Sequence, residues 1–440
     1  MEWHRLISDI RLGMEEYHDP RTHTRNDFQR DYDRLVFSSP FRRLQNKTQV
    51  FPLPGSVFVH NRLTHSLEVS SVGRSMAAEA ALMLYERHKA EPDAQKFFVL
   101  GDITATACLC HDLGNPPFGH SGEKTIATFF SEGPGMELKG SLTDAEWADF
   151  VNFDGNANSF RLLTHQFVGR RKGGFAMTYS TLASIVKYPF TSLNSPKRGK
   201  FGFFESEREI YERVARTLGI DEIEKGRFAR HPLVWLMEAA DDICYQIMDL
   251  EDAHRLKILS TAETAEIMLN FFEPKERDKR VMSMRRLDDP NEQIGYLRSK
   301  VIGELVSSCS RSFVEHEEEI LAGTMTKSLV SLSSPTLREA YDTSAELSAE
   351  RIYRSSEVVE IEIAGNRILT YLMEVLTDAV MHPNKNFSKL LLKKVPDQYD
   401  IHAHDTYGRL QAVLDHVSGM TDIYALDLFR KLNGHSLPQV

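Results

Sequence analysis

Cysteine is scarce in this sequence, and its scarcity excludes two kinds of site. The 440 residues contain four cysteines, at positions 108, 110, 244 and 309, which are too few and too irregularly spaced for a disulfide framework. Cys108 and Cys110 lie beside His111, but no second cysteine pair follows to complete a thiolate zinc site. We therefore expect reduced thiols in a cytoplasmic protein.

Long apolar runs are also missing. No stretch of about 18 uncharged apolar residues occurs, so we expect no transmembrane helix, and the first residues lack the apolar core of a secretory signal. The net charge of −10 disfavours a protein that coats nucleic acid with its whole surface. Basic residues do gather locally at Arg161, Arg170–Lys172 and Lys197–Lys200. Each cluster is either a solvated loop or a set of phosphate contacts, and composition does not choose between them.

The main pattern in the sequence is the periodicity of α-helices. Apolar residues recur at three- and four-residue spacing through long segments such as 233–247, whereas strand-like alternation is confined to a short candidate at Gln49–Leu53. Loops of functional length are expected at 131–136 and 188–202, and the charged tract 273–289 is expected to be exposed. No repeat or low-complexity linker marks a domain boundary. We predict an all-α, mainly α-helical protein with a C-terminal helical extension.

One His-Asp pair differs from the other two in its setting. The pairs at 18–19 and 404–405 lie in polar segments and are most simply surface residues. His111-Asp112 follows a small, apolar segment that we expect to form a buried helix, with Asp102 as its N-cap and Gly114 as its stop. Metal coordination is one way to offset the cost of burying an ionised carboxylate. A capping aspartate beside a hydrogen-bonded core histidine is the competing interpretation.

A second polar pair follows a rigid, proline-containing loop at 115–119. The next helix is expected to begin at His120, so that His120 and Glu123 share one of its faces. An imidazole held by a carboxylate is the usual arrangement for acid–base chemistry. The alternative is the ordinary preference of a helix N-terminus for an acidic residue.

A mononuclear metal site needs three or four ligands from separated segments. His65, at the start of an apolar helix, is one candidate, and the apolar helix near residue 241 offers two adjacent aspartates. Periodicity divides the polar residues of that helix into two stripes. The stripe that borders the apolar face holds Asp241, Tyr245 and Asp249. The stripe predicted to face solvent holds Glu238, Asp242 and Gln246. We therefore choose Asp241 as the ligand.

At these residues the sequence resembles the HD-domain deoxynucleoside triphosphate triphosphohydrolases, the dGTPase family. The resemblance is dispersed over most of the chain, so the combination is far more specific than any single motif. The similar segments are 41–45, 47–51, 60–69, 111–123, 153–157, 178–183, 187–189, 238–243 and 417–426.

The resemblance implies a fold and a set of site residues. The whole chain, 1–440, is then one unit, with an HD core at 50–255 and a helical extension at 256–440. The implied metal ligands are His65, His111, Asp112 and Asp241. The implied catalytic pair is His120 and Glu123. The implied substrate contacts are Gln49 at the 3′-hydroxyl, Tyr245 and Asp249 at the sugar, and Arg62, Asn115, Lys187 and Tyr188 at the triphosphate. Mixed nitrogen and oxygen ligands suit a divalent ion, namely Mg, Mn, Co, Ni, Fe or Zn.

The resemblance also implies an activity and partners. Members of this family cleave a dNTP to deoxynucleoside and tripolyphosphate, form homo-oligomers that are often hexamers, and in several cases respond to a nucleotide or single-stranded DNA effector. We expect dGTP or several dNTPs as substrate. Two alternatives are another HD nucleotide phosphohydrolase and a catalytically silent nucleotide- or DNA-binding regulator. The presence of His120 and Glu123 together with Gln49 and the stripe of Tyr245 and Asp249 argues against the first, and the complete metal and catalytic sets argue against the second. Asn115 stands where some relatives have a second histidine, which places acid chemistry on His120.

Overall fold

The computed structural model describes residues 1–16, 24–51, 59–196, 199–354 and 356–437. This part of the chain is mainly α-helical, which confirms the predicted all-α class. Its one sheet is a small antiparallel pair, β1 (Glu222–Glu224) with β2 (Arg227–Phe228). Among the described helices, none has the length and apolar character needed to cross a membrane.

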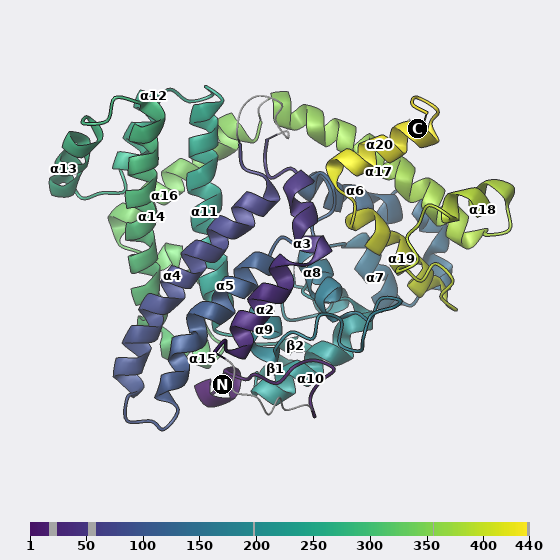
Figure 1. Cartoon of the computed structure of the whole chain (residues 1–440), viewed down its shortest axis with the longest axis horizontal. Helices are drawn as coiled ribbons and strands as arrows, with labels where there is room; N and C mark the ends of the chain where they lie inside the picture. The colour runs from purple at the N-terminus through teal and green to yellow at the C-terminus, as the bar shows by residue number, and fades with distance from the viewer. Residues whose placement is uncertain (17–23, 52–58, 197–198, 355, 438–440) are drawn as a thin grey trace.

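The connections between helices range from the single residue between α14 and α15 to long segments such as 185–207 between α9 and α10 (Figure 1). Those of the first half are α1 (Trp3–Leu6), α2 (Asp27–Val36), α3 (Ser39–Arg43), α4 (Arg62–His88), α5 (Leu100–Cys110), α6 (Gly119–Ser131), α7 (Asp144–Val151), α8 (Gly155–Thr164), α9 (Tyr179–Ser184), α10 (Arg208–Leu218) and α11 (Leu233–Arg255). Those of the second half are α12 (Thr261–Leu269), α13 (Pro274–Met284), α14 (Pro290–Glu315), α15 (Glu317–Leu321), α16 (Pro335–Leu347), α17 (Ser356–Met381), α18 (Asn386–Leu392), α19 (Thr406–Ser418) and α20 (Asp422–Leu432).

Helix α5 is the centre of the core. All of its residues except Asp102 are buried, and it packs against α2, α4, α9 and α11. Small side chains let these helices approach closely: a Cβ added to Gly73 on α4 would lie 2.5 Å from the Cys108 sulfur and 3.4 Å from Ala240 on α11. The three helices that meet here therefore bring residues near 65, 111 and 241 into one region.

The second half of the chain packs on two sides of this core (Figure 1). Helix α14 packs against both α4 and α11, with α12 and α16 beside it. Helix α17 crosses α6 and contacts α18, α19 and α20. The predicted C-terminal extension thus surrounds the core rather than being attached at one end.

The stripe of α11 that was predicted to face solvent is covered instead. Gln246 is only 4% exposed, and its side-chain amide donates a hydrogen bond to the Ser348 hydroxyl at 2.9 Å. Asp242 is half-buried, and its backbone carbonyl accepts a hydrogen bond from Tyr341. The prediction was wrong because a segment about 100 residues away packs on this face, and periodicity within one helix carries no information about that segment.

The structure also tests three local predictions made from the sequence. Asp102 is not an N-cap, because α5 begins at Leu100; Asp102 lies in the first turn and accepts a hydrogen bond from Asn26. Residues 49–51 form bends rather than a strand, and the rest of that candidate lies outside the described residues. The charged tract is exposed as predicted, since α13 has no buried residue.

Candidate active site

Three of the four predicted metal ligands lie together. His65 is in the first turn of α4, whose start is fixed by a capping box between Asn61 and Thr64. His111 follows α5 directly, and Asp241 lies in the middle of α11. The Asp241 Oδ1 atom is 3.1 Å from His65 Nε2 and 3.4 Å from His111 Nε2. The candidate ligand atoms of these three residues all lie within 4.8 Å of one another.

The donor atoms of this cluster fit a divalent metal ion. His111 Nδ1 is 2.6 Å from the Cys108 carbonyl, which makes Nδ1 the donor and leaves the Nε2 lone pair facing the cluster. That Nε2 atom is buried without a hydrogen-bond partner among the described residues. Burial disfavours charge here, but the carboxylates of Asp112 and Asp241 outweigh it and raise the pKa of His111 to about 9. The two histidines in turn hold the pKa of Asp241 well below its usual range despite burial.

Asp112, the fourth predicted ligand, lies at the edge of the cluster. Its Oδ2 atom is 3.7 Å from His111 Nε2 and accepts a hydrogen bond from Arg62 at 2.6 Å. Its Oδ1 atom accepts a hydrogen bond from the Asn115 amide at 2.5 Å. Arg62 and Asn115, which were predicted to hold phosphates, are therefore also placed to orient this carboxylate.

The predicted catalytic pair is formed on the first turn of α6. His120 Nδ1 is 2.8 Å from Glu123 Oε2, and the other Glu123 oxygen accepts a hydrogen bond from the Gly155 backbone at 2.8 Å. A side chain at position 155 would collide with this arrangement, because an added Cβ would lie 2.7 Å from Glu123 Oε1. Glu123 is buried, whereas the His120 side chain is 70% exposed. Hydrogen bonding to the Glu123 carboxylate raises the pKa of His120.

The loop before α6 is held by residues far away in the sequence. Phe118 adopts the left-handed region, with φ of 62°, and its backbone N–H donates to the Asp422 carboxylate at 3.0 Å. The Lys47 amine donates to the carbonyls of Asn115, at 2.5 Å, and Ser418, at 2.8 Å. Burial lowers the pKa of Lys47 to about 7. The loop between the His-Asp cluster and the His120–Glu123 pair is thus held by residues from both the N-terminal and the C-terminal parts of the chain.

One cavity collects most of the predicted site residues. Its volume is about 230 Å³. The lining residues are Gln49, Arg62, His111, Asp112, Asn115, His120, Glu123, Asn156, Lys187, Tyr188, Lys200, Met237, Asp241 and Tyr245. We call it the catalytic cavity. The predicted residues His65 and Asp249 are absent from its wall. Asn156, Lys200 and Met237 are in the wall although no role was predicted for them. The sequence could have pointed to two of these three residues, since Asn156 lies in a segment similar to the family and Lys200 lies in a basic cluster.

Two of the predicted sugar contacts, Gln49 and Tyr245, line the cavity, whereas Asp249 does not. Asp249 is buried, its carboxylate accepts a hydrogen bond from the Tyr353 hydroxyl at 2.7 Å, and burial raises its pKa to about 8. The rings of Tyr353 and Tyr245 lie 5.8 Å apart. Gln49 presents a buried side-chain oxygen that has no partner among the described residues. Tyr353 was missed because it lies in the C-terminal half, with no motif around it.

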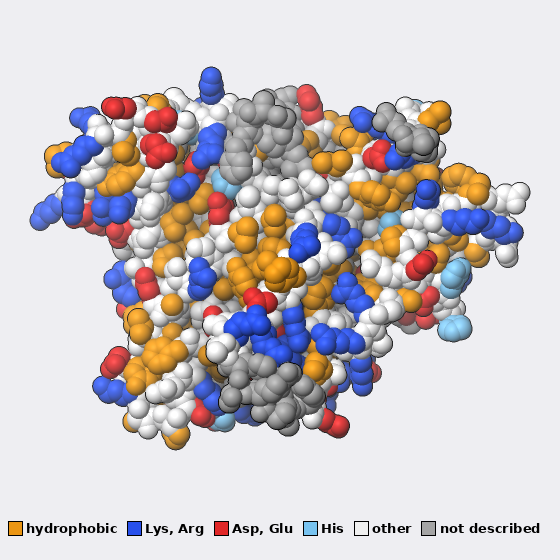
Figure 2. Space-filling view, viewed as in Figure 1, with side chains coloured by type: hydrophobic (Ala, Val, Ile, Leu, Met, Phe, Trp, Pro, Cys, Tyr) orange, Lys and Arg blue, Asp and Glu red, His pale blue; other side chains and the backbone are white. Residues whose placement is uncertain are grey.

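The basic clusters have different surroundings. Arg161 is buried and pairs with Glu207 at 2.7 Å and Asp415 at 2.8 Å, so it is neither a solvated residue nor a phosphate contact. Arg170 lies 4.8 Å from the centre of the Phe175 ring, outside the catalytic cavity. Basic side chains gather on the face around α2 and α3 (Figure 2). Residues 197 and 198 lie outside the described part of the chain.

Comparisons with known proteins agree with these features. The HD domain model matches residues 62–146, and the phosphohydrolase-associated domain model matches residues 332–431. The chain is 38% identical to a deoxyguanosinetriphosphate triphosphohydrolase-like protein of Synechocystis, over 99% of this chain and 100% of that protein. It is 35% identical to a protein of the same description from Pseudomonas aeruginosa, over the full length of both. It is 29% identical to the deoxyguanosinetriphosphate triphosphohydrolase of Yersinia enterocolitica, over 92% of this chain and 93% of that protein.

Proposed function

The chain belongs to the family of HD-domain deoxyguanosinetriphosphate triphosphohydrolase-like proteins, and on that premise we propose that it hydrolyses dGTP or several dNTPs to deoxynucleoside and tripolyphosphate in a metal-dependent reaction. The observation that carries this proposal is that one cavity is lined both by members of the His-Asp cluster and by the His120–Glu123 pair. No described feature favours the silent-regulator alternative. The homo-oligomer, the effector and the cytoplasmic location stay predictions.

The metal would be held by His65, His111, Asp112 and Asp241. When bound, a divalent ion supplies a Lewis acid for an α-phosphate oxygen and lowers the pKa of a coordinated water. Mg, Mn, Co, Ni, Fe and Zn all accept such mixed ligands. Arg62 keeps Asp112 in place through its 2.6 Å hydrogen bond.

The proton chemistry is assigned to His120. The oxygen of a water forms a bond to the α-phosphorus and the bond from phosphorus to the 5′-oxygen breaks, so the water releases a proton to solvent and the 5′-oxygen gains one. A protonated His120 imidazole, tied to Glu123, donates that proton to the leaving oxygen. The His120 ring is exposed and lines the cavity, which suits a group that must reach substrate.

The proposed substrate contacts form two sets, one for the phosphates and one for the sugar. Arg62, Asn115, Lys187 and Tyr188, joined by Lys200, would neutralise the phosphates. Gln49, Tyr245 and Asp249 would hold the sugar, where close packing by Tyr245 rejects a 2′-hydroxyl by crowding.

The product assay tests the proposed reaction directly. We expect the full-length protein, incubated with each dNTP and Mn²⁺ or Mg²⁺, to release tripolyphosphate and deoxynucleoside, resolved by anion-exchange and reversed-phase chromatography. EDTA should stop the reaction, and the matching ribonucleotide should react more slowly. Release of pyrophosphate or orthophosphate would place the protein in another phosphohydrolase class, and absence of any product would favour a binding protein.

The pH dependence tests the His120–Glu123 pair. Glu123 raises the pKa of His120, so the protonated acid persists to higher pH and is lost as pH rises through that raised pKa. In Glu123→Gln the amide keeps the shape but not the charge. We therefore expect the alkaline decline of kcat to move to lower pH. The pH profile of kcat measures this, with Glu132→Gln at the exposed end of the same helix as control. An alkaline limb that stays in place would contradict the proposed pairing.

A further inference from the structure

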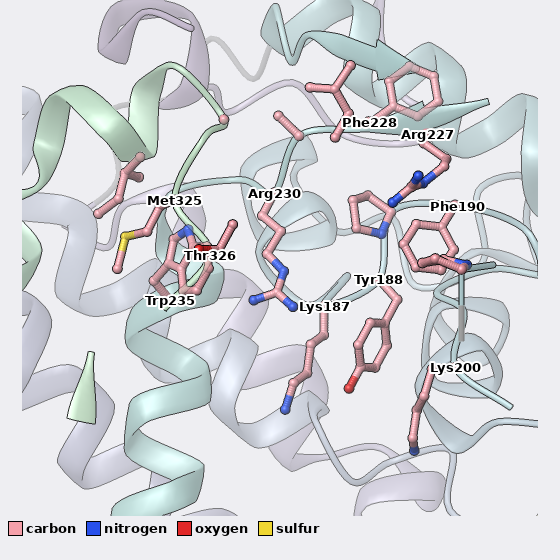
Figure 3. Close-up of a pocket in the computed structure, with 16 residues that line it drawn as sticks. Lys187, Tyr188, Phe190, Lys200, Arg227, Phe228, Arg230, Trp235, Met325 and Thr326 are labelled. Carbon is pink, nitrogen blue, oxygen red and sulfur yellow. The ribbon is translucent and has the colours of Figure 1, made fainter. Parts of the chain in front are cut away.

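A second pocket adjoins the catalytic cavity, and its volume is about 430 Å³. The lining residues are Lys187, Tyr188, Pro189, Phe190, Pro196, Lys200, Ile223, Arg227, Phe228, Ala229, Arg230, Trp235, Ile320, Gly323, Met325 and Thr326. We call it the outer pocket. It shares Lys187, Tyr188 and Lys200 with the catalytic cavity. These three residues therefore form the wall between the two spaces, and in Figure 3 their side chains extend in the same direction.

The wall of the outer pocket is cationic. Lys187, Lys200, Arg227 and Arg230 line it, and among the described residues no acidic side chain does, although the chain as a whole carries a net charge of −10. Outside the pocket, Asp154 lies 3.9 Å from Lys200. Glu238, outside the pocket, pairs with both Lys187, at 2.9 Å, and Arg230, at 3.0 Å, so one carboxylate serves two cations. Such a concentration of positive charge at a concave surface raises the local concentration of anions.

The two arginines are fixed in position by aromatic side chains. The Arg230 guanidinium lies 4.6 Å from the centre of the Trp235 ring, and Figure 3 shows it between Trp235 and Lys187. The Arg227 guanidinium lies 5.6 Å from the Phe190 ring. Stacking of this kind holds the guanidinium plane while leaving N–H donors in the plane for an anion.

Arg227 also has an unused donor. Its Nε atom is buried without a hydrogen-bond partner among the described residues, while its terminal nitrogen pairs with the exposed Glu224. An unsatisfied buried N–H is costly. The Arg227 guanidinium therefore has donor capacity that the described residues leave unused.

The volumes of the catalytic cavity and the outer pocket indicate which anion the outer pocket binds. The catalytic cavity, at about 230 Å³, lies below the range of about 300–1,000 Å³ that is typical of small-molecule pockets. Lys187 and Lys200 are the two lysines that line the catalytic cavity and the outer pocket opens beyond them, so the distal phosphates of a dNTP whose α-phosphate lies at the His-Asp cluster can extend into the outer pocket. We propose that the outer pocket binds the distal phosphates of the triphosphate and holds the tripolyphosphate product after cleavage. This inference rests on the proposed function.

Direct binding of inorganic tripolyphosphate tests this proposal without turnover. The full-length protein in metal-free buffer is titrated calorimetrically with tripolyphosphate and with orthophosphate. We expect tripolyphosphate to bind much more tightly, because only the longer anion spans several cations. Arg227→Gln and Arg230→Gln should each weaken it about tenfold to a hundredfold, the scale of a charge-assisted hydrogen bond. Arg216→Gln, which removes a cation that is 78% exposed elsewhere, should bind as the wild type does.

Product inhibition gives a second measurement. Tripolyphosphate should inhibit dNTP hydrolysis, and its inhibition constant should rise in the two outer-pocket variants by the same factor as the dissociation constant. Thermal unfolding checks that the variants are folded. The variants Arg227→Lys and Arg230→Lys keep the positive charge but lose the planar set of guanidinium N–H donors. We expect them to bind tripolyphosphate with intermediate affinity.

The outcomes separate this proposal from the proposed function. Unchanged tripolyphosphate affinity in folded Arg227→Gln and Arg230→Gln overturns the outer-pocket assignment, even if the protein hydrolyses dNTPs. A different result is that the two variants lose affinity for tripolyphosphate, but the wild-type protein releases no tripolyphosphate from any dNTP. That result refutes both the proposed function and the role of the pocket as a product site. The outer pocket would then be a polyphosphate-binding pocket only. A third result is that the wild-type protein binds a second dNTP molecule per chain and that the two variants do not. The pocket would then be a nucleotide site, which overturns its assignment to the product.

Discussion

Replacing Asp241 with asparagine is expected to abolish both metal binding and dNTP hydrolysis. The Asp241 Oδ1 atom lies 3.1 Å from His65 Nε2 and 3.4 Å from His111 Nε2, so it is the anionic centre of the cluster. Asparagine keeps the volume but removes the charge that compensates a divalent cation. Loss of a residue that only supports a ligand typically costs 10–100-fold in metal affinity. We therefore expect a loss above about a hundredfold and less than about 1% of the wild-type kcat.

The neighbouring aspartate provides a matched control for this experiment. Asp242→Asn makes the same chemical change one residue later on α11, at a half-buried position outside the catalytic cavity. Metal content after dialysis, measured by mass spectrometry, and Mn²⁺ titration should distinguish the two variants. If Asp241→Asn keeps full metal occupancy, the ligand assignment is wrong.

Replacing His120 with alanine is expected to lower kcat by about 100- to 10,000-fold, the usual contribution of a general acid or base. Metal content should not change, because His120 is outside the His-Asp cluster. Stability should change little, since the side chain is 70% exposed and its removal leaves no buried cavity. KM should stay close to the wild-type value if the proton is transferred only in the transition state.

A second histidine–carboxylate pair supplies the control. His382, just past the C-terminal end of α17, is exposed and lies 2.8 Å from Asp378, outside the catalytic cavity. His382→Ala should hydrolyse dNTPs at the wild-type rate. An unchanged kcat in His120→Ala would remove His120 from the mechanism, and a loss of metal in that variant would show a structural role instead.

The helical class and much of the candidate site could be predicted because their signals are local. Apolar spacing identifies α11, and its phase separates Asp241, which lies beside the two histidines, from Asp242, which lies outside the cavity. The spacing of His120 and Glu123 likewise predicts their contact on one helical turn. The roles of these residues as ligands and catalysts stay predictions until they are tested.

The remaining features depend on contacts between distant segments. Tyr353 reaches Asp249 across 104 residues, and Gln246, predicted to face solvent, is covered by Ser348. Lys47 joins the loop at Asn115 to the C-terminal region. No periodicity within one helix encodes such pairings. The predicted boundary after residue 255 also stays a proposal, since α11 ends at Arg255 but α14 packs on both α4 and α11.

The anchoring of the loop before α6 bears on the order in which the protein becomes active during synthesis. The proposed metal ligands lie between residues 65 and 241, whereas the partners that hold the loop, Ser418 and Asp422, lie close to the end of the chain. Because a protein is made from its N-terminus, the ligands leave the ribosome long before these partners do. The left-handed turn at Phe118 gains its C-terminal support last. A nascent chain can therefore expose every proposed ligand while it still lacks the residues that hold this loop, and we expect the proposed hydrolysis only after residue 422 has left the ribosome.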